Sequence, residues 1–201
     1  MPSVYQLKSA FQGLLRPAVG LLHRAGVTAN QVTVLAMAAS IGYAAALSSY
    51  PDCLSLWLGL PVFLLLRMAL NAIDGMLARE FGQASTLGAF LNEIGDVVSD
   101  AALIFALVAV APAQMAGIAL LAVLAMLTEF AGVCGWAIST DRRYDGPFGK
   151  SDRAVALGAL GLAVGLGADP AAILRYAIPV AAALLLITVF NRIRAALRKG
   201  V

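Results

Sequence analysis

Long apolar segments with almost no charged residues limit what this chain can fold into more than any other feature. Between Arg24 and Asp52 no charged side chain occurs. A helix needs about 20 mainly apolar residues to cross a bilayer, and this stretch is long enough. The chain is 61% hydrophobic and 12% charged, whereas soluble domains are about 45–50% apolar and about 25% charged. The sequence therefore excludes an ordinary soluble enzyme and predicts an all-α integral membrane protein.

Six apolar segments are predicted to be transmembrane helices of a single membrane domain over residues 1–201. These spans are residues 29–49, 54–79, 86–111, 114–138, 154–168 and 171–191. Residues 3–24 differ, because their apolar side chains recur at helical spacing beside basic and polar ones. That pattern is typical of an amphipathic helix lying in the membrane interface.

The basic residues predict the orientation of the spans. Lysine and arginine gather in residues 1–28, at Arg79 beside the turn 80–87, in residues 139–153 and at the C-terminus, and the alternate loops hold almost none, apart from Arg175. Because cytoplasmic loops are rich in Lys and Arg, both termini are expected on the cytoplasmic side of an inner membrane. The same placement explains the net charge of +3 without a nucleic-acid partner.

Polar side chains inside the second and third predicted spans are the candidates for chemistry. Ionisable residues within a span are costly, and they usually mark a functional site. The short turn at residues 80–85 makes these two spans antiparallel neighbours. At about 1.5 Å per residue, Asp74 and Asp96 then lie about 7 and about 12 Å below the cytoplasmic rim. The candidates in the two spans are Arg67, Asn71, Asp74, Asn92, Glu93, Asp96 and Asp100.

These side chains offer oxygen ligands without cysteine or histidine, which favours a hard cation such as Mg²⁺ or Mn²⁺. A divalent cation at a site facing the cytoplasm can hold a diphosphate group. Gly75, Ala78 and Gly88 would leave room for a nucleotide between the helices, or would simply let the helices pack closely.

One stretch of the sequence resembles a known signature. Residues 71–79 read N-A-I-D-G-M-L-A-R, and after eight more residues come G, three residues, N, three residues and D. This resembles the CDP-alcohol phosphotransferase signature D-x2-D-G-x2-A-R-x8-G-x3-D-x3-D. Six of its eight fixed positions match, namely Asp74, Gly75, Ala78, Arg79, Gly88 and Asp96. Asn30 and Thr33 near the start of the first span, and Gly149-Lys150 before the fifth, extend the resemblance over most of the chain.

The resemblance implies a six-span membrane enzyme, commonly a homodimer, that moves a phospho-alcohol group from a CDP-linked donor to a hydroxyl acceptor and releases CMP. Carried over, Asp74 is a metal ligand, and Asp96 is the base that deprotonates the acceptor and a further candidate ligand. The resemblance also places Gly75, Ala78, Arg79, Gly88 and Lys150 at the nucleotide.

The sequence departs from the signature at two positions: the signature has aspartate where this chain has Asn71 and Asn92. An amide oxygen can bind Mg²⁺ but carries no charge, so four expected carboxylates become two, which is a poor charge balance for two divalent ions. One hypothesis is that Glu93 or Asp100 takes a place among the metal ligands, beside Asn71 and Asn92. Other interpretations are that the site holds one metal ion or none, or that the protein is an inactive member of the family.

Arg67 has two interpretations. It precedes Asn71 by one helical turn and could project a fixed positive charge toward the carboxylates. Alternatively it forms a buried ion pair with Glu129 of the fourth span.

The depth of the site favours a lipid-linked donor, so the sequence predicts transfer of a phosphatidyl group from CDP-diacylglycerol. Arg142, Arg143, Lys150 and Arg153 could bind a phosphate on the acceptor, as in glycerol phosphate or inositol phosphate, or could be ordinary cytoplasmic basic residues. The alternatives are transfer from a CDP-amino-alcohol to diacylglycerol and, from another class, a small ion-coupled transporter. The absence of an internal repeat weakens the transporter.

Overall fold

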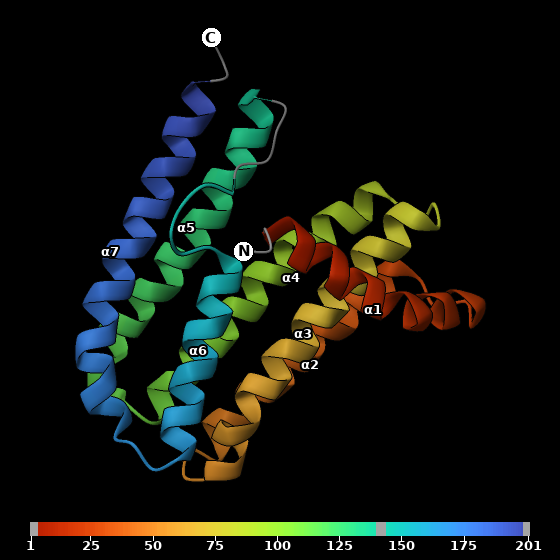
Figure 1. Ribbon diagram of the computed structural model, residues 1–201. Coiled ribbons are helices and arrows are strands. Elements are labelled where there is room, and N and C mark those ends of the chain that lie inside the picture. Colours follow the sequence, from red (N-terminus) through yellow and green to blue (C-terminus); the bar gives the residue numbers. More distant parts are fainter. Residues whose placement is uncertain (1–3, 140–143, 199–201) are drawn as a thin grey trace. The chain divides into compact units, whose positions relative to one another are not determined.

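A computed structural model describes residues 4–139 and 144–198, and all the regular elements in this part of the chain are helices (Figure 1). The α-helices are α1 (Val4–Arg24), α2 (Ala29–Ser49), α3 (Leu54–Glu80), α4 (Thr86–Phe105), α5 (Met115–Ser139), α6 (Lys150–Gly165) and α7 (Pro170–Leu197). Two short 3₁₀ helices, η1 (Ala106–Ala109) and η2 (Pro112–Gln114), connect α4 to α5.

Four helical segments are long and apolar enough to cross a membrane. They are Ala29–Ser49, Leu54–Glu80, Pro112–Ile138 and Pro170–Leu197. This finding supports a multi-pass membrane protein and agrees with four of the six predicted spans.

The other two predicted spans are helices that do not meet the same criteria, each for its own reason. Helix α4 carries Glu93, Asp96 and Asp100 among its 20 residues, and α6 has only 16 residues. The α-helical part of the third span ends at Phe105, where the chain turns into η1. Whether α4 and α6 cross the bilayer stays a prediction.

The contacts of the chain divide it into two compact units. Unit 1 consists of Met1–Ala39 and Leu65–Asp96, and unit 2 consists of Ser40–Leu64 and Val97–Val201. Helices α2, α3 and α4 therefore contribute one part to each unit. The prediction of a single membrane domain is not decided by this division.

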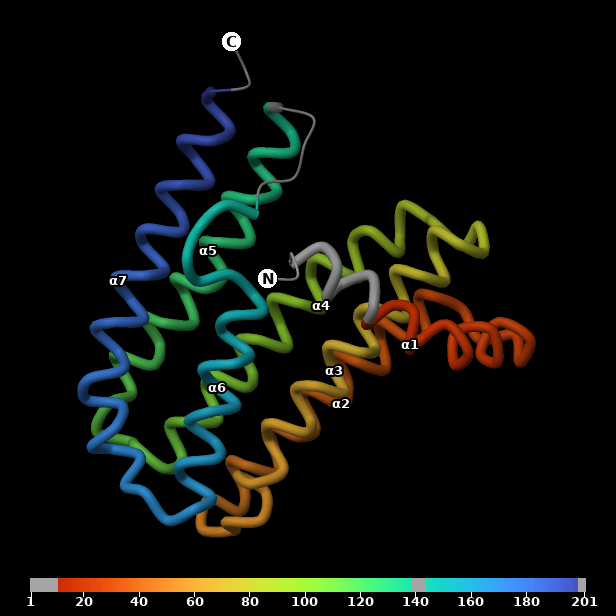
Figure 2. Tube along the Cα trace, viewed as in Figure 1, coloured from red at the N-terminus to blue at the C-terminus, as the bar shows by residue number. Residues whose placement is uncertain are grey.

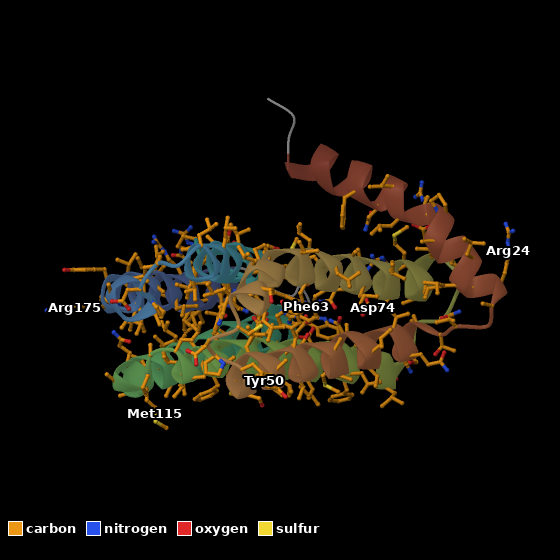
Figure 3. The ribbon with its side chains drawn as sticks, turned by 90° about the horizontal axis from the view of Figure 1, so that it is seen from below. Arg24, Tyr50, Phe63, Asp74, Met115 and Arg175 are labelled. Atoms are coloured by element: carbon orange, nitrogen blue, oxygen red, sulfur yellow. The ribbon has the colours of Figure 1, made fainter. Side chains whose placement is uncertain are left out.

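Unit 1 is held together by an apolar cluster that joins α1 to α2 and α3. Val19 of α1 is buried together with Ala29, Val32, Ile73, Met76 and Leu77. At the end of α3, Arg16 lies 3.3 Å from the carboxylate of Glu80, and the ring of His23 packs at 4.3 Å from that of Phe81. Helix α1 is therefore docked on α3 through one apolar face (Figure 3), as an amphipathic helix would be. Its location in a membrane interface stays a prediction.

In unit 2, α5 packs along α7 and runs in the same direction, while α6 runs the opposite way (Figure 2). Met115, at the start of α5, and Arg175, near the start of α7, lie at the same end of this unit (Figure 3). Glycines on α6 allow a close approach of α3. A Cβ on Gly165 would lie 2.7 Å from the backbone nitrogen of Leu58, and one on Gly161 would lie 2.8 Å from a side-chain carbon of Leu60.

Candidate active site

The end of α3 and the start of α4 are joined by a tight turn within unit 1. Gly82 in this turn has a φ of 66°, a left-handed conformation that glycine adopts without strain. Ser85 caps α4, because its hydroxyl accepts a hydrogen bond from the backbone N–H of Gly88 at 2.9 Å. The turn thus makes the two halves of the signature antiparallel neighbours, as the sequence predicts.

Asn71 of α3 and Asp96 of α4 are in direct contact. The Asn71 side-chain amide donates a hydrogen bond to Asp96 Oδ1 at 3.1 Å. Arg67, one turn earlier in α3, places Nη2 at 3.9 Å from the same carboxylate oxygen and donates to the backbone oxygen of Asp96 at 3.4 Å. The side chains of Arg67 and Asp96 are 5% and 13% exposed. A carboxylate and a guanidinium thus face each other in a largely buried layer.

Asp74 lies in the same unit and is also buried, on α3 (Figure 3). Its Oδ2 accepts a hydrogen bond from the hydroxyl of Thr33 at 2.8 Å. Thr33 also donates to the backbone oxygen of Ala29, at 3.1 Å. Helix α2 therefore positions the Asp74 carboxylate through Thr33, one of the residues that extend the resemblance.

The glycines of the signature lie against polar side chains. A Cβ on Gly75 would meet the Arg79 guanidinium at 3.0 Å, and one on Gly88 would meet Asn30 Oδ1 at 2.6 Å. Asn30 also donates to Ser85 Oγ, at 3.5 Å. Ala78 lies on α3 and is half-buried. The two glycines thus lie against polar side chains, which goes beyond close packing of helix backbones.

The structure places Asn92 and Glu93 on α4, both half-buried. Lys150 begins α6 in unit 2 and is half-buried. Arg142 and Arg143 of the predicted basic loop lie outside the described residues. The roles expected for these five residues stay predictions.

Asp100 follows Asp96 by one turn of α4 and belongs to a buried ion network of unit 2. Arg153 Nη2 lies 2.7 Å from Asp100 Oδ2 and 3.0 Å from Glu129 Oε1. Arg192 Nη1 lies 3.5 Å from Glu129 Oε2 and donates to the backbone oxygen of Thr128. Two arginines and two carboxylates thus share one network that joins α4, α5, α6 and α7.

This network includes interactions that sequence reasoning missed. Arg192 lies near the basic C-terminus that supports the predicted orientation, yet it is only 2% exposed. Glu129 in an apolar span was the signal for it, because a buried carboxylate needs a cation. The ion pair of Arg67 with Glu129 would connect the two units and stays a prediction.

The side-chain oxygen atoms of unit 1 are ligands of the kind that a hard divalent cation prefers, and only a few of them are charged. Within the described part of the chain, no group of three or more His, Cys, Asp or Glu side chains is arranged to hold a metal ion. Magnesium commonly binds through one or two carboxylates and completes its shell with water and substrate phosphates. By their chemistry, Asp74 and Asp96, with the amide oxygens of Asn71 and Asn92, are donors of the kind that such an ion takes, and their role as ligands stays a prediction.

Comparison with known proteins gives a family match over most of the chain. The sequence model for CDP-alcohol phosphatidyltransferases matches residues 26–193. Inner membrane protein YnbA of Escherichia coli is 43% identical over 197 residues, which cover 97% of this chain and 96% of that protein. Phosphatidylinositol phosphate synthase of Mycobacteroides abscessus is 34% identical over 101 residues, covering 50% of this chain and 44% of that one.

The fold is also found among solved structures. The crystal structure of Mycobacterium tuberculosis phosphatidylinositol phosphate synthase with CDP-DAG bound aligns with a TM-score of 0.73 at 20% identity, covering 90% of this chain and 92% of that chain. At this level of identity the similarity concerns the fold.

Proposed function

Because the chain belongs to the CDP-alcohol phosphatidyltransferase family, we propose that this phosphotransferase moves a phosphatidyl group from CDP-diacylglycerol to a hydroxyl acceptor and releases CMP. The observation that carries the proposal is the 3.1 Å hydrogen bond between Asn71 and Asp96. It joins the two halves of the signature in one buried layer. The CDP-DAG bound by the structural relative supports the choice of donor.

Transfer requires that the acceptor oxygen attack the phosphorus that carries the diacylglycerol. The new P–O bond forms as the bond from that phosphorus to the bridging oxygen breaks, and CMP leaves with the electron pair. The acceptor proton passes to Asp96, which serves as the general base. Arg67 and Asn71 hold the Asp96 carboxylate in place through the contacts at 3.9 and 3.1 Å.

Binding of the donor is assigned to the residues around Asp74. Asp74 and Asp96, with Asn71 and Asn92, would hold a divalent ion such as Mg²⁺ or Mn²⁺. When bound, that ion would neutralise charge on the donor diphosphate. Arg79, whose guanidinium lies across Gly75, would bind a phosphate of the nucleotide. Ala78 and Gly88 would border the nucleotide.

Glu93 and Asp100 are further candidate metal ligands. Glu93 is one turn or less from Asn92 and Asp96 along α4, and it remains a candidate ligand. Asp100 is 2.7 Å from Arg153, so a role as metal ligand would require it to share its charge with that arginine.

The acceptor is proposed to be a hydroxyl compound, and a phosphorylated polyol such as glycerol phosphate would suit the basic side chains in the segment 142–153, which includes the start of α6. Arg153 is already bound to Asp100 and Glu129. Among the described basic residues of that segment, Lys150 is then the candidate for the acceptor phosphate.

The proposal is tested with purified protein in nanodiscs, CDP-diacylglycerol, Mg²⁺ or Mn²⁺, and acceptors supplied one at a time. The acceptors are glycerol phosphate, inositol phosphate and serine. A separate reaction with CDP-ethanolamine and diacylglycerol tests the alternative, in which the alcohol is CDP-linked and the lipid is the acceptor. We expect CMP release with CDP-diacylglycerol and at least one acceptor, and a new phospholipid by mass spectrometry. Folded protein that releases no CMP under any of these conditions would refute the transferase.

We further propose an inner-membrane protein with six spans, an interfacial α1 and both termini in the cytoplasm. The distribution of lysine and arginine supports this orientation, and the name of the Escherichia coli relative supports the location. A homodimer is proposed from family membership.

A further inference from the structure

The charge of the donor site differs from that of the signature. Asp74 and Asp96 are carboxylates, whereas amides stand at Asn71 and Asn92, where the signature has aspartate. Two carboxylates balance the charge of one divalent ion. A second divalent ion would depend on the donor diphosphate alone for charge balance, and binding it in this largely buried layer would be unfavourable.

A guanidinium lies where it opposes a second cation. Arg67 is 4% exposed, and its Nη2 is 3.9 Å from Asp96 Oδ1 and 3.4 Å from the Asp96 backbone oxygen. Charges interact strongly at such distances when they are partly buried. A second divalent ion bound to Asp96 Oδ1 would therefore be repelled by Arg67, whereas the single ion proposed above would bind Asp96 through its other oxygen, Oδ2.

Asn71 reinforces this arrangement. A carboxylate oxygen only accepts hydrogen bonds, so the NH₂ end of the Asn71 amide faces Asp96 Oδ1, at 3.1 Å. That nitrogen donates hydrogens and does not act as a metal ligand. Asp96 Oδ1 thus has two nitrogen neighbours from α3, one of them charged.

We infer that the site binds one divalent ion per chain and that the guanidinium of Arg67 supplies the second positive charge beside Asp96. The inference rests on the proposed function, because it assumes that this is the donor site. It makes Arg67 a positioning residue, which holds the base through its charge and replaces a second metal ion. In this account the positive charge of Arg67 compensates for the second ion, which the amides at positions 71 and 92 no longer bind.

The number of bound ions tests the inference directly. Mn²⁺ is titrated into the full chain in nanodiscs containing CDP-diacylglycerol, and free Mn²⁺ is followed by electron paramagnetic resonance. We expect one ion per wild-type chain. In the double variant Asn71→Asp with Asn92→Asp, a second ion is expected to bind weakly. Adding Arg67→Gln is expected to tighten that second ion by about tenfold or more, because the repulsion is removed.

Arg175→Gln is the matched control, because it removes an exposed arginine of α7 that belongs to unit 2. It should leave the ion count at one. Arg67→Lys keeps a positive charge and should also leave the count at one. Size-exclusion elution and circular dichroism check that each variant is folded.

The inference is overturned if the wild-type chain binds two ions with similar affinity, or if it binds none while CMP is released. It is also overturned if Arg67→Gln leaves the affinity of the second ion unchanged in the double variant. The wild-type count remains decisive if Arg67→Gln does not fold. CMP release, measured on the same samples, separates these outcomes from failure of the transferase itself.

Discussion

The two carboxylates of the site, Asp74 and Asp96, have different neighbours and are therefore suited to different tasks. Asp74 accepts a hydrogen bond from Thr33 at 2.8 Å and is almost fully buried. Asp96 is held by Asn71 and lies near the charge of Arg67. The hydroxyl of Thr33 fixes one oxygen of Asp74, whereas the contacts of Asp96 with Asn71 and Arg67 fix the orientation that a base requires.

Replacing Asp96 with asparagine should remove the proposed base while preserving the size of the side chain. We expect the rate of CMP release to fall by about 10²–10⁴-fold, the usual contribution of a positioned base. The measurement is the initial rate at saturating CDP-diacylglycerol. Asp52→Asn, in the exposed loop between α2 and α3, is the control. An Asp96→Asn enzyme with the wild-type rate would remove Asp96 from the mechanism.

Gly88→Ala tests whether the space at the start of α4 matters. Its Cβ would lie 2.6 Å from Asn30 Oδ1 and 3.0 Å from Ser85 Oγ, so both side chains must move. If Gly88 borders the nucleotide, kcat/KM for CDP-diacylglycerol should fall by about 10- to 100-fold. Gly42→Ala, whose Cβ would meet nothing within 4 Å, should have no such effect. Equal activity of the two variants would contradict the assignment.

At the residue scale, the sequence predicted which side chains gather but not how they pair. The short turn predicted that the polar residues of the second and third spans lie on antiparallel neighbours, and Asn71 and Asp96 of these two helices are hydrogen-bonded. The contact of Arg67 with Asp96 depends on how a long side chain extends between two helices. Periodicity does not encode that path, so two interpretations of Arg67 stayed open.

Among the elements, α6 depends on glycine for its close contact with α3 in unit 2. Gly165→Ala would place a Cβ 2.7 Å from the backbone nitrogen of Leu58, which cannot move without its helix. Overpacking of this kind costs about 1–3 kcal/mol. We expect a lower thermal unfolding temperature in detergent. Gly158→Ala, with its nearest atom at 3.5 Å, should unfold close to wild type, and equal losses for both variants would contradict this packing.

Helix boundaries follow from local chemistry more closely than from hydropathy. The sequence predicted the fifth span from residue 154, but α6 begins at Lys150. The Gly149 N–H donates to the Asp152 carboxylate at 2.9 Å, which caps the helix before its apolar part begins. Similarly, α7 begins at Pro170, because Asp169 accepts a hydrogen bond from the Ala171 N–H. Hydropathy detects the apolar part of α6 and misses its polar first turn.

At the scale of the whole molecule, the proposed six-span topology requires that both α4 and α6 cross the bilayer. The proposed topology predicts that alkaline phosphatase inserted after residue 52, 112 or 169 is active outside the cytoplasm. Insertions after residue 83 or 146, or at the C-terminus, should be inactive. If the reporter after residue 112 is inactive, α4 does not cross, and the six-span topology is wrong.

The central claim is that Asp74 and Asp96 together hold the diphosphate of a lipid-linked donor through a divalent cation. Its most direct test is equilibrium binding of fluorescent CDP-diacylglycerol to the protein in nanodiscs, with Mg²⁺ and after chelation. The proposed mechanism predicts binding that requires Mg²⁺ in the wild type and is lost when both residues are changed to asparagine. Tight, Mg²⁺-dependent binding by a folded Asp74→Asn, Asp96→Asn double variant would contradict it.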